Sequence, residues 1–317
     1  MGRATMTGLS HPALFYRSMR EYADVLARFV IDGLTAAQPV LVAVPSRNLA
    51  TLRDTLGDAA TGVTMADMTE VGRNPARILG GVLGAFADRH PQRRVRIVGE
   101  PVWVGRTGAE YPACVQHEAL INAAFAGRAV TVVCPYDASR LPAGVLADAR
   151  RTHPELWSDG ARAISTDYAP DAALQRYNRP LSRSSTAVTY TVRSLTDLQR
   201  ARSFAARYAQ WSGLDGDGVA DLALITTELA TNSLQHGCGP CRLSFWQRDD
   251  HLICEARDSG RFDDPVAGRR PLPPDAARGR GLFVVNALAD LVRTHTGPRG
   301  TTTHAYLRVR FSHRNLS

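Results

Sequence analysis

In the first half of the chain, two kinds of segment alternate, and they differ in their pattern of apolar and polar positions. Four short segments are mostly apolar, as expected of buried strands: residues 40–44, 63–67, 95–98 and 130–134. Helical patterns separate and follow them: residues 48–56, 75–89, 110–125 and 145–151. Strands regularly spaced by helices imply a parallel sheet covered on both faces, so we predict a doubly wound α/β fold for this half.

The second half begins with a different pattern. Residues 188–192 alternate as in an antiparallel-type strand. The pattern that follows predicts three helices and three more strands: helices at residues 195–211, from about residue 219 and at 282–291, and strands at 241–247, 252–257 and 302–310. We therefore predict an α/β sandwich in which helices cover a mixed sheet.

A polar stretch separates the two halves. Residues 158–186 have no clear period and contain Pro170 and Pro180, which indicates an interdomain linker with a short helix near residues 171–177. We therefore expect one domain over residues 10–157 and another over residues 187–312.

The identity of the basic residues is more informative about function than the net charge. The formal net charge of the 317 residues is +8, but all 38 basic residues are arginine. Such a bias indicates GC-rich codons, and no arginine-rich run with interleaved aromatic residues is present, so we expect no direct nucleic-acid binding. A Walker A loop and the protein kinases of the eukaryotic type both require lysine. A nucleotide would have to be held by backbone amides, arginine and metal.

Other sequence-wide features favour a cytoplasmic protein. No apolar run approaches the ~18 residues of a membrane span, and the N-terminus lacks a signal-peptide pattern. The five cysteines are expected to be reduced thiols. Cys238-Gly-Pro-Cys241 matches the thioredoxin tetrapeptide, but it follows a predicted helix and leads into a strand, so a turn is favoured over a redox or zinc role.

Four polar or glycine-containing motifs occur in order in the second half. Glu228 and Asn232 lie four residues apart and share one face of a helix. The others are Asp258-Ser-Gly260 after a strand, Gly279-Arg-Gly281 before an apolar helix, and Gly300-Thr301 before the last strand.

This order of motifs resembles the Bergerat (GHKL) ATP-binding fold, and within it the anti-sigma factor serine kinases of the RsbW type. The resemblance implies that Asp258 accepts a hydrogen bond from adenine, that Gly260 and Thr301 border the base, and that Asn232 binds Mg²⁺. Residues 279–282, namely Gly279, Arg280, Gly281 and Leu282, would face the phosphates of ATP at a helix N-terminus.

In the same resemblance Glu228 is the catalytic base, and residues 261–278 are the ATP lid. The lid has four prolines: Pro265, Pro271, Pro273 and Pro274. Arg261 and Phe262 stand where the family usually has a second glycine. Without that glycine the lid hinge should be stiffer. The sequence is therefore also compatible with a protein that binds ATP but turns it over weakly.

Motifs of the first half resemble the MEDS sensory domain, which is similar in outline to RecA/KaiC-like sheets but here has no phosphate-loop lysine. The motifs are His11-Pro-Ala-Leu-Phe-Tyr16, residues 33–34, 39–45 and 72–77, Gly99-Glu-Pro-Val-Trp103, His117-Glu118, Cys134-Pro-Tyr-Asp137 and Arg151-Thr-His-Pro154. The resemblance implies sensing of a signal and names no ligand.

Ligands of open parallel sheets bind beyond the carboxyl ends of the strands. We expect a sensory pocket formed by the following residues: Arg47, Glu100, Trp103, Arg106 and His117. The alternative is that these side chains only tie loops together. His117-Glu118 also matches the phosphoacceptor motif of histidine kinases, but its position between sheet strands favours a core or pocket histidine.

These interpretations predict an ATP- and Mg²⁺-dependent serine/threonine kinase that phosphorylates a STAS-type anti-sigma factor antagonist under control of a sensory domain. Its partners would be that antagonist or a sigma factor, and the resemblance also implies a homodimer. The alternative is a regulator that sequesters its partner without phosphotransfer. A histidine kinase is disfavoured because no phosphoacceptor hairpin precedes residue 188.

Overall fold

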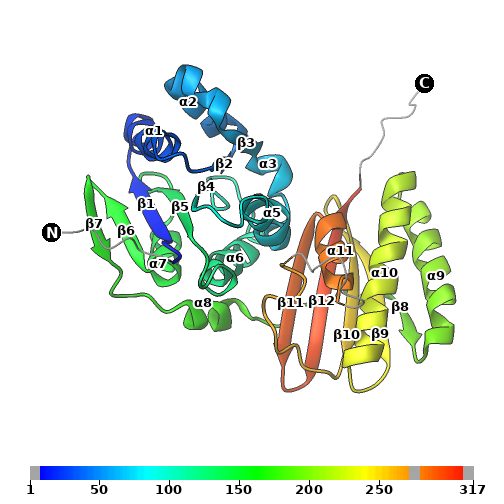
Figure 1. The fold of residues 1–317 in the computed structure, drawn as a ribbon. Coiled ribbons are helices and arrows are strands. Elements are labelled where there is room, and N and C mark those ends of the chain that lie inside the picture. The colour runs from blue at the N-terminus through cyan, green and yellow to red at the C-terminus, as the bar shows by residue number, and fades with distance from the viewer. Residues whose placement is uncertain (1–7, 271–278, 310–317) are drawn as a thin grey trace. The chain divides into compact units, whose positions relative to one another are not determined.

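The computed structural model describes residues 8–270 and 279–309. The chain divides into two compact units, with the boundary in the sequence between Tyr177 and Asn178. Figure 1 shows each unit as a sheet with helices packed on it.

The first unit contains a seven-stranded sheet in the order β3-β2-β4-β5-β1-β6-β7. The strand bounds are β1 Pro12–Tyr16, β2 Val40–Val44, β3 Thr64–Asp67, β4 Val95–Gly99, β5 Val130–Asp137, β6 Glu155–Ser158 and β7 Ala161–Ile164. All neighbours are parallel except β6 and β7. The predicted doubly wound α/β class is confirmed.

Helices pack on both faces of this sheet because its central strands are apolar on both sides. Val133 belongs to the core formed with α1 (Met19–Thr35) and α2 (Ser46–Leu56). The next residue, Cys134, contacts α6 (Tyr111–Ala124) on the other face. Other helices of this unit are α3 (Met68–Val71), α7 (Ala143–Thr152), α8 (Pro170–Tyr177), and the 3-10 helix η1 (Gly57–Gly62).

The predicted helix at residues 75–89 is present but is not α-helical throughout. It begins as α4 (Pro75–Arg77), continues as the π-helical segment η2 (Ile78–Gly84) and ends as α5 (Ala85–Asp88). Strand β1 and helix α1 were not predicted at all.

The predicted linker, residues 158–186, begins too early. Residues 155–164 form a β-hairpin that extends the sheet, and α8 buries Ala173 completely, so residues up to Tyr177 belong to the first unit. The sequence did not reveal β7 because all four of its residues are exposed and carry no alternating apolar pattern.

The second unit has a five-stranded sheet in the order β11-β12-β10-β9-β8. The bounds are β8 Val188–Val192, β9 Cys241–Arg248, β10 His251–Asp258, β11 Leu291–Gly297 and β12 Gly300–Arg308. All pairings between these strands are antiparallel, so the predicted mixed sheet is corrected to an antiparallel one. The predicted helix at 282–291 ends at Leu288, and β11 follows it.

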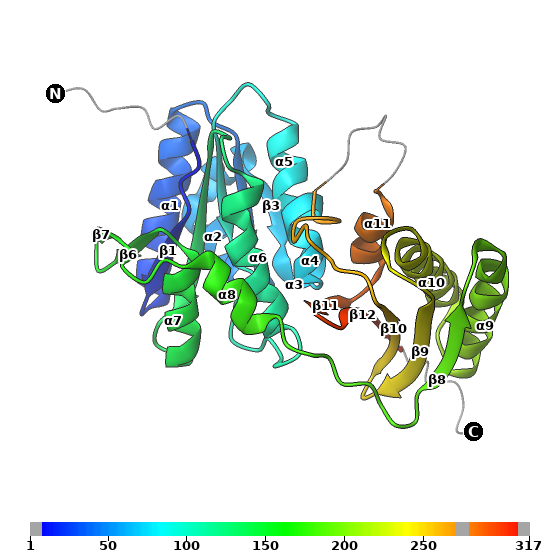
Figure 2. The same ribbon diagram turned by 90° about the horizontal axis from the view of Figure 1, so that it is seen from below.

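Helices α9 (Leu198–Trp211), α10 (Gly216–His236) and α11 (Gly281–Leu288) lie over one face of this sheet (Figure 2). The short 3-10 helix η3 (Leu195–Asp197) leads into α9. Alternate strand residues such as Leu243 and Phe245 are fully buried under the helices. Within residues 8–270 and 279–309, no helix combines the length and apolarity needed to cross a bilayer.

Candidate nucleotide-binding site

Helix α10 presents Glu228 and Asn232 at the edge of its buried face. The helix begins at a cap in which the Asp215 side chain accepts a hydrogen bond from the Gly218 amide, and it buries Leu222, Leu229 and other apolar residues against the sheet. Glu228 and Asn232 lie beside this stripe and are half-buried. The helical packing therefore gives both side chains fixed positions near the surface.

The N-terminus of α11 lies against these two side chains. A β-carbon added to Gly281 would lie 2.5 Å from Oε2 of Glu228 and 3.2 Å from Nδ2 of Asn232. A side chain at this position would force the end of the Glu228 side chain to move. The structure thus brings together Glu228, Asn232 and Gly281, while Gly279 and Arg280 lie exposed just before the helix.

Nδ2 of Asn232 is buried and makes no hydrogen bond with the described residues. Buried amide groups normally have a partner. The side chain therefore has capacity to bind a group from outside the protein.

The Asp258 carboxylate lies at the end of β10 and is held from two sides. Oδ2 accepts a hydrogen bond of 2.6 Å from the Ser233 hydroxyl, and Oδ1 accepts one of 2.8 Å from the Gly260 amide. Each oxygen keeps a second lone pair. Because Ser233 is on α10, one residue from Asn232, the helix places both predicted binding side chains.

Gly260 and Thr301 lie close to Asp258. Thr301 pairs with Asp258 across β12 and β10, and its hydroxyl donates a 2.9 Å hydrogen bond to the Gly260 carbonyl. A β-carbon on Gly260 would lie 2.6 Å from the Gly237 α-carbon. At Gly300, whose φ is +108°, it would lie 2.0 Å from the Asp258 carbonyl oxygen. The bare backbone allows these segments to meet.

The described part of the lid segment contacts α11. A β-carbon on Gly268 would lie 2.4 Å from Cβ of Leu282, and Asn286 donates a 2.8 Å hydrogen bond to the Gly268 carbonyl. Leu282 of α11 thus packs against the lid at Gly268. Of the four lid prolines Pro265 is described, whereas Pro271, Pro273 and Pro274 lie outside the described residues, as does Arg278.

Arg269 is the lid arginine with the most unusual surroundings. Burial lowers its pKa to about 10, and its NH1 group makes no hydrogen bond with the described residues. A buried guanidinium nitrogen without a hydrogen-bond acceptor favours the binding of an anion.

Two residues of the predicted sensory pocket, Trp103 and Arg106, contact each other. Arg106 stacks its guanidinium 3.7 Å from the centre of the Trp103 ring and donates to the carbonyls of Gly72, Arg73 and Pro101. Arg106 therefore ties loops together, which was the alternative interpretation.

The other predicted pocket residues have different surroundings. Glu100 is buried and accepts hydrogen bonds from Tyr22 and Asn48, and burial raises its pKa to about 8. Arg47 is exposed on α2. His117 is buried on α6.

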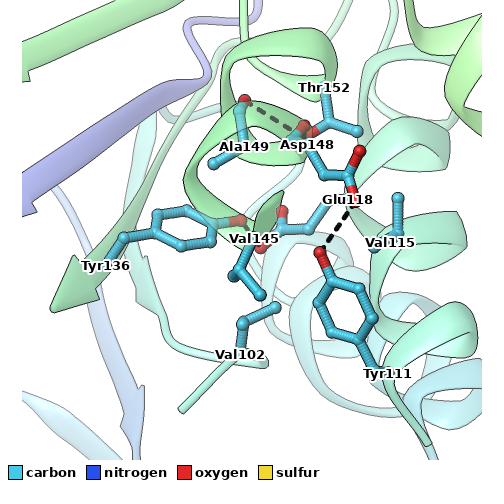
Figure 3. A pocket seen from close by; sticks show the side chains of 9 residues that line it. All are labelled: Val102, Tyr111, Val115, Glu118, Tyr136, Val145, Asp148, Ala149 and Thr152. Atoms are coloured by element: carbon cyan, nitrogen blue, oxygen red, sulfur yellow. Dashed lines mark hydrogen bonds between the residues drawn. The ribbon is translucent and has the colours of Figure 1, made fainter. Parts of the chain in front are cut away.

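The structure has a small pocket beside α6 that the sequence did not indicate. Its lining residues, shown in Figure 3, are Val102, Tyr111, Val115, Glu118, Tyr136, Val145, Asp148, Ala149 and Thr152. Tyr136 donates a 3.0 Å hydrogen bond to Oε1 of Glu118, and Tyr111 donates one of 2.9 Å to Asp148. Glu118 and Tyr136 belong to motifs of the family resemblance, but the sequence did not show that their side chains meet.

The Cys238–Cys241 tetrapeptide forms the turn between α10 and β9. Both cysteines are free thiols; Cys238 is exposed, whereas burial raises the pKa of Cys241 to about 11. A buried thiol with a raised pKa is a poor nucleophile, so the geometry favours the turn interpretation.

Comparison with known protein families assigns both units. Residues 10–154 match the family model of the methanogen/methylotroph, DcmR sensory (MEDS) domain. Residues 192–307 match that of the histidine kinase-like ATPase domain. The protein therefore combines a MEDS sensory domain with a histidine kinase-like ATPase domain.

Similarity to individual proteins is weaker. No curated protein matches the chain significantly. The structure of the RsbU and RsbW domains of Rv1364c from Mycobacterium tuberculosis aligns with 42% of this chain at 17% identity and a TM-score of 0.32, and the chain spans 35% of it. Acinetobacter baumannii histidine kinase AdeS aligns with 63% of this chain and 95% of its own at 9% identity and a TM-score of 0.24. These TM-scores are too low to carry an argument.

Proposed function

We propose that the second unit binds ATP with Mg²⁺ and transfers a phosphoryl group to a serine or threonine of a partner protein, under control of the MEDS domain. The observation that carries the proposal is the contact of Gly281 with Glu228 and Asn232. It joins the catalytic carboxylate, the metal-binding amide and a glycine-flanked helix N-terminus, as phosphoryl transfer requires.

Asp258 is proposed to recognise adenine. Its carboxylate keeps lone pairs after accepting from Ser233 and Gly260, and an amino group on the base can only donate. Gly260 and Thr301 beside it present backbone and a small side chain, which leaves room for a flat ring.

Asn232 is proposed to hold Mg²⁺ through Oδ1, a hard oxygen ligand. Its Nδ2 group makes no hydrogen bond with the described residues, and the side chain faces the start of α11 at Gly281. Bound Mg²⁺ would neutralise charge on the phosphates. Arg269 is proposed to contact the terminal phosphate, because its buried NH1 group has no hydrogen-bond acceptor in the described structure.

Glu228 is proposed to be the general base. Its carboxylate would accept the proton of the attacking hydroxyl, a role that usually contributes about 10²–10⁴-fold to the rate. The partner proposed from the family resemblance is a STAS-type anti-sigma factor antagonist, together with the sigma factor that competes for it, and a homodimer is the proposed assembly.

One observation favours a second candidate, a nucleotide-dependent regulator that sequesters its partner without phosphotransfer. Phe262, at the hinge of the lid, donates its amide hydrogen to the Thr296 hydroxyl on β11 at 3.2 Å. This tether, and the lack of a glycine at positions 261 and 262, restrict the lid motion that turnover commonly requires.

Calorimetry with Mg²⁺-ATP and Mg²⁺-ADP tests the site. We expect the wild type and Glu228→Gln to bind and Asp258→Ala to bind at least ~10-fold more weakly, since a base-edge hydrogen bond is lost. Wild-type protein that binds neither nucleotide would overturn the proposal. Transfer of phosphate from ATP to a serine-containing STAS protein, lost in Glu228→Gln, separates the kinase from the sequestering regulator.

A further inference from the structure

We propose that the first unit contains a buried tetrahedral metal site, best suited to Zn²⁺, formed by His11, Glu118, Cys134 and His153. One ligand atom of each residue lies within 4.8 Å of all the others, and all four side chains are buried. This site is separate from the nucleotide-binding site of the second unit.

The backbone brings the four residues together from distant parts of the sequence. His11 immediately precedes β1 and His153 follows α7 just before β6, and these two strands are parallel neighbours. Their imidazole rings therefore lie side by side, with centroids 4.1 Å apart. Cys134 lies on β5, the other neighbour of β1, and Glu118 reaches the same point from α6.

Four of the six distances between the ligand atoms match a tetrahedron. Oε2 of Glu118 lies 3.3 Å from Nε2 of His11, 3.4 Å from Nε2 of His153 and 3.3 Å from Sγ of Cys134. Sγ of Cys134 lies 3.5 Å from Nε2 of His11. Zinc bonds of about 2.0–2.3 Å to nitrogen, oxygen and sulfur place tetrahedral ligand atoms roughly 3.3–3.8 Å apart.

Hydrogen bonds at the far side of each ring turn the metal-binding nitrogens inward. Nδ1 of His153 lies 2.8 Å from the Ala149 carbonyl, which can only accept, so Nδ1 carries the hydrogen. Nδ1 of His11 lies 3.1 Å from Oδ1 of Asn122, whose amide nitrogen donates to the Thr152 carbonyl. When the rings are neutral, both Nε2 atoms therefore present lone pairs to the cluster, as zinc-ligating histidines do.

The cluster then has more acceptors than hydrogens. Two imidazole lone pairs and the carboxylate oxygen Oε2 converge, and the Cys134 thiol offers a single hydrogen among them. Nε2 of His153 accordingly makes no hydrogen bond within the described residues, although it lies 3.4 Å from Oε2 of Glu118. An uncompensated acceptor cluster is costly in a buried place. A divalent cation with one thiolate and one carboxylate gives a net charge of zero and satisfies all four ligand atoms.

The donor set also indicates what the metal does. Four protein ligands complete the tetrahedral shell, which is typical of structural zinc. Tyr136 donates a 3.0 Å hydrogen bond to the second carboxylate oxygen, Oε1, and so orients Glu118 between the metal site and the pocket of Figure 3. The metal would tie strands β1 and β5 and the start of β6 to α6 and fix one wall of that pocket.

Metal analysis of the full-length protein tests the proposal. Protein from zinc-supplemented cells is expected to carry one zinc per chain, and Cys134→Ser and His153→Gln less than a tenth of that. The matched control is Cys114→Ser, another buried cysteine of the same unit, which should keep its zinc. Equal zinc in Cys134→Ser and Cys114→Ser would contradict the proposal.

A second measurement is independent of whether the variants fold. Wild-type protein stripped with a chelator should bind one Co²⁺ with a thiolate-to-cobalt absorption band, and Zn²⁺ should displace it. Zinc should also raise the midpoint of thermal unfolding by about 5 °C or more. A wild-type protein that stays folded, carries no metal as purified and takes up neither ion would show that the cluster is only a hydrogen-bonded group.

Discussion

The hydroxyl of Tyr22 donates a hydrogen bond of 3.0 Å to Oε2 of Glu100, and both side chains are almost completely buried. Glu100 also accepts hydrogen bonds from Nδ2 of Asn48, at 2.9 Å to each oxygen. Within the described residues this carboxyl group forms no ion pair, and it is held in the interior of the first unit.

This burial makes the stability of the first unit dependent on pH. Desolvation raises the pKa of Glu100 from 4.5 to about 8, so between these values the folded protein keeps a proton that the unfolded chain has released. Rising pH therefore favours unfolding across this range. In Glu100→Gln, which cannot ionise, the thermal midpoint should fall less than that of the wild type between pH 5 and pH 8. Parallel pH profiles measured by calorimetry would contradict this.

At Gly281 we expect a methyl group to disrupt the nucleotide site. In Gly281→Ala the new carbon would start 2.5 Å from Oε2 of Glu228 and 3.2 Å from Nδ2 of Asn232, so both side chains would have to leave their positions beside α11. Nucleotide affinity should fall roughly 10- to 100-fold by calorimetry. The control is Gly216→Ala on α10, where an added carbon meets nothing within 4 Å. Equal affinities of the two variants would argue against the site.

The role of Arg106 can be separated from that of a ligand-binding arginine. It donates to three backbone carbonyls and to Oε1 of Glu110, and lysine cannot reproduce this fork. Arg106→Lys should lower the free energy of unfolding of the first unit by about 2–4 kcal/mol in urea titrations. The exposed Arg47→Lys should change it by less than about 0.5 kcal/mol. Equal effects would show that the loop contacts are unimportant.

Thiol labelling tests the assignment of the Cys-Gly-Pro-Cys turn. Of the five cysteines, Cys238 is exposed and Cys114, Cys134, Cys241 and Cys254 are buried. One thiol per folded chain should react rapidly with Ellman's reagent, and five after unfolding. The reactive thiol should disappear in Cys238→Ser. Rapid loss of two thiols on mild oxidation would instead indicate a redox pair.

The sequence by itself determined the two fold classes, because their signals are local. Apolar runs such as residues 40–44 and the ordered motifs at Glu228, Asp258 and Gly281 need only neighbouring residues to be recognised. It did not reveal β7, whose residues are exposed, or β11, whose apolar start continues the pattern of α11. The antiparallel character of the whole second sheet also depends on which strands become neighbours.

Only the tertiary structure decided which polar side chains meet. It placed Glu100 against Tyr22 and Asn48, and it directed Arg106 to the backbone carbonyls of residues 72, 73 and 101. It joined His11, Glu118, Cys134 and His153, although up to 142 positions of sequence separate them. Strand order sets such contacts: β1 lies between β5 and β6, and this long-range pairing leaves no periodic trace in the chain.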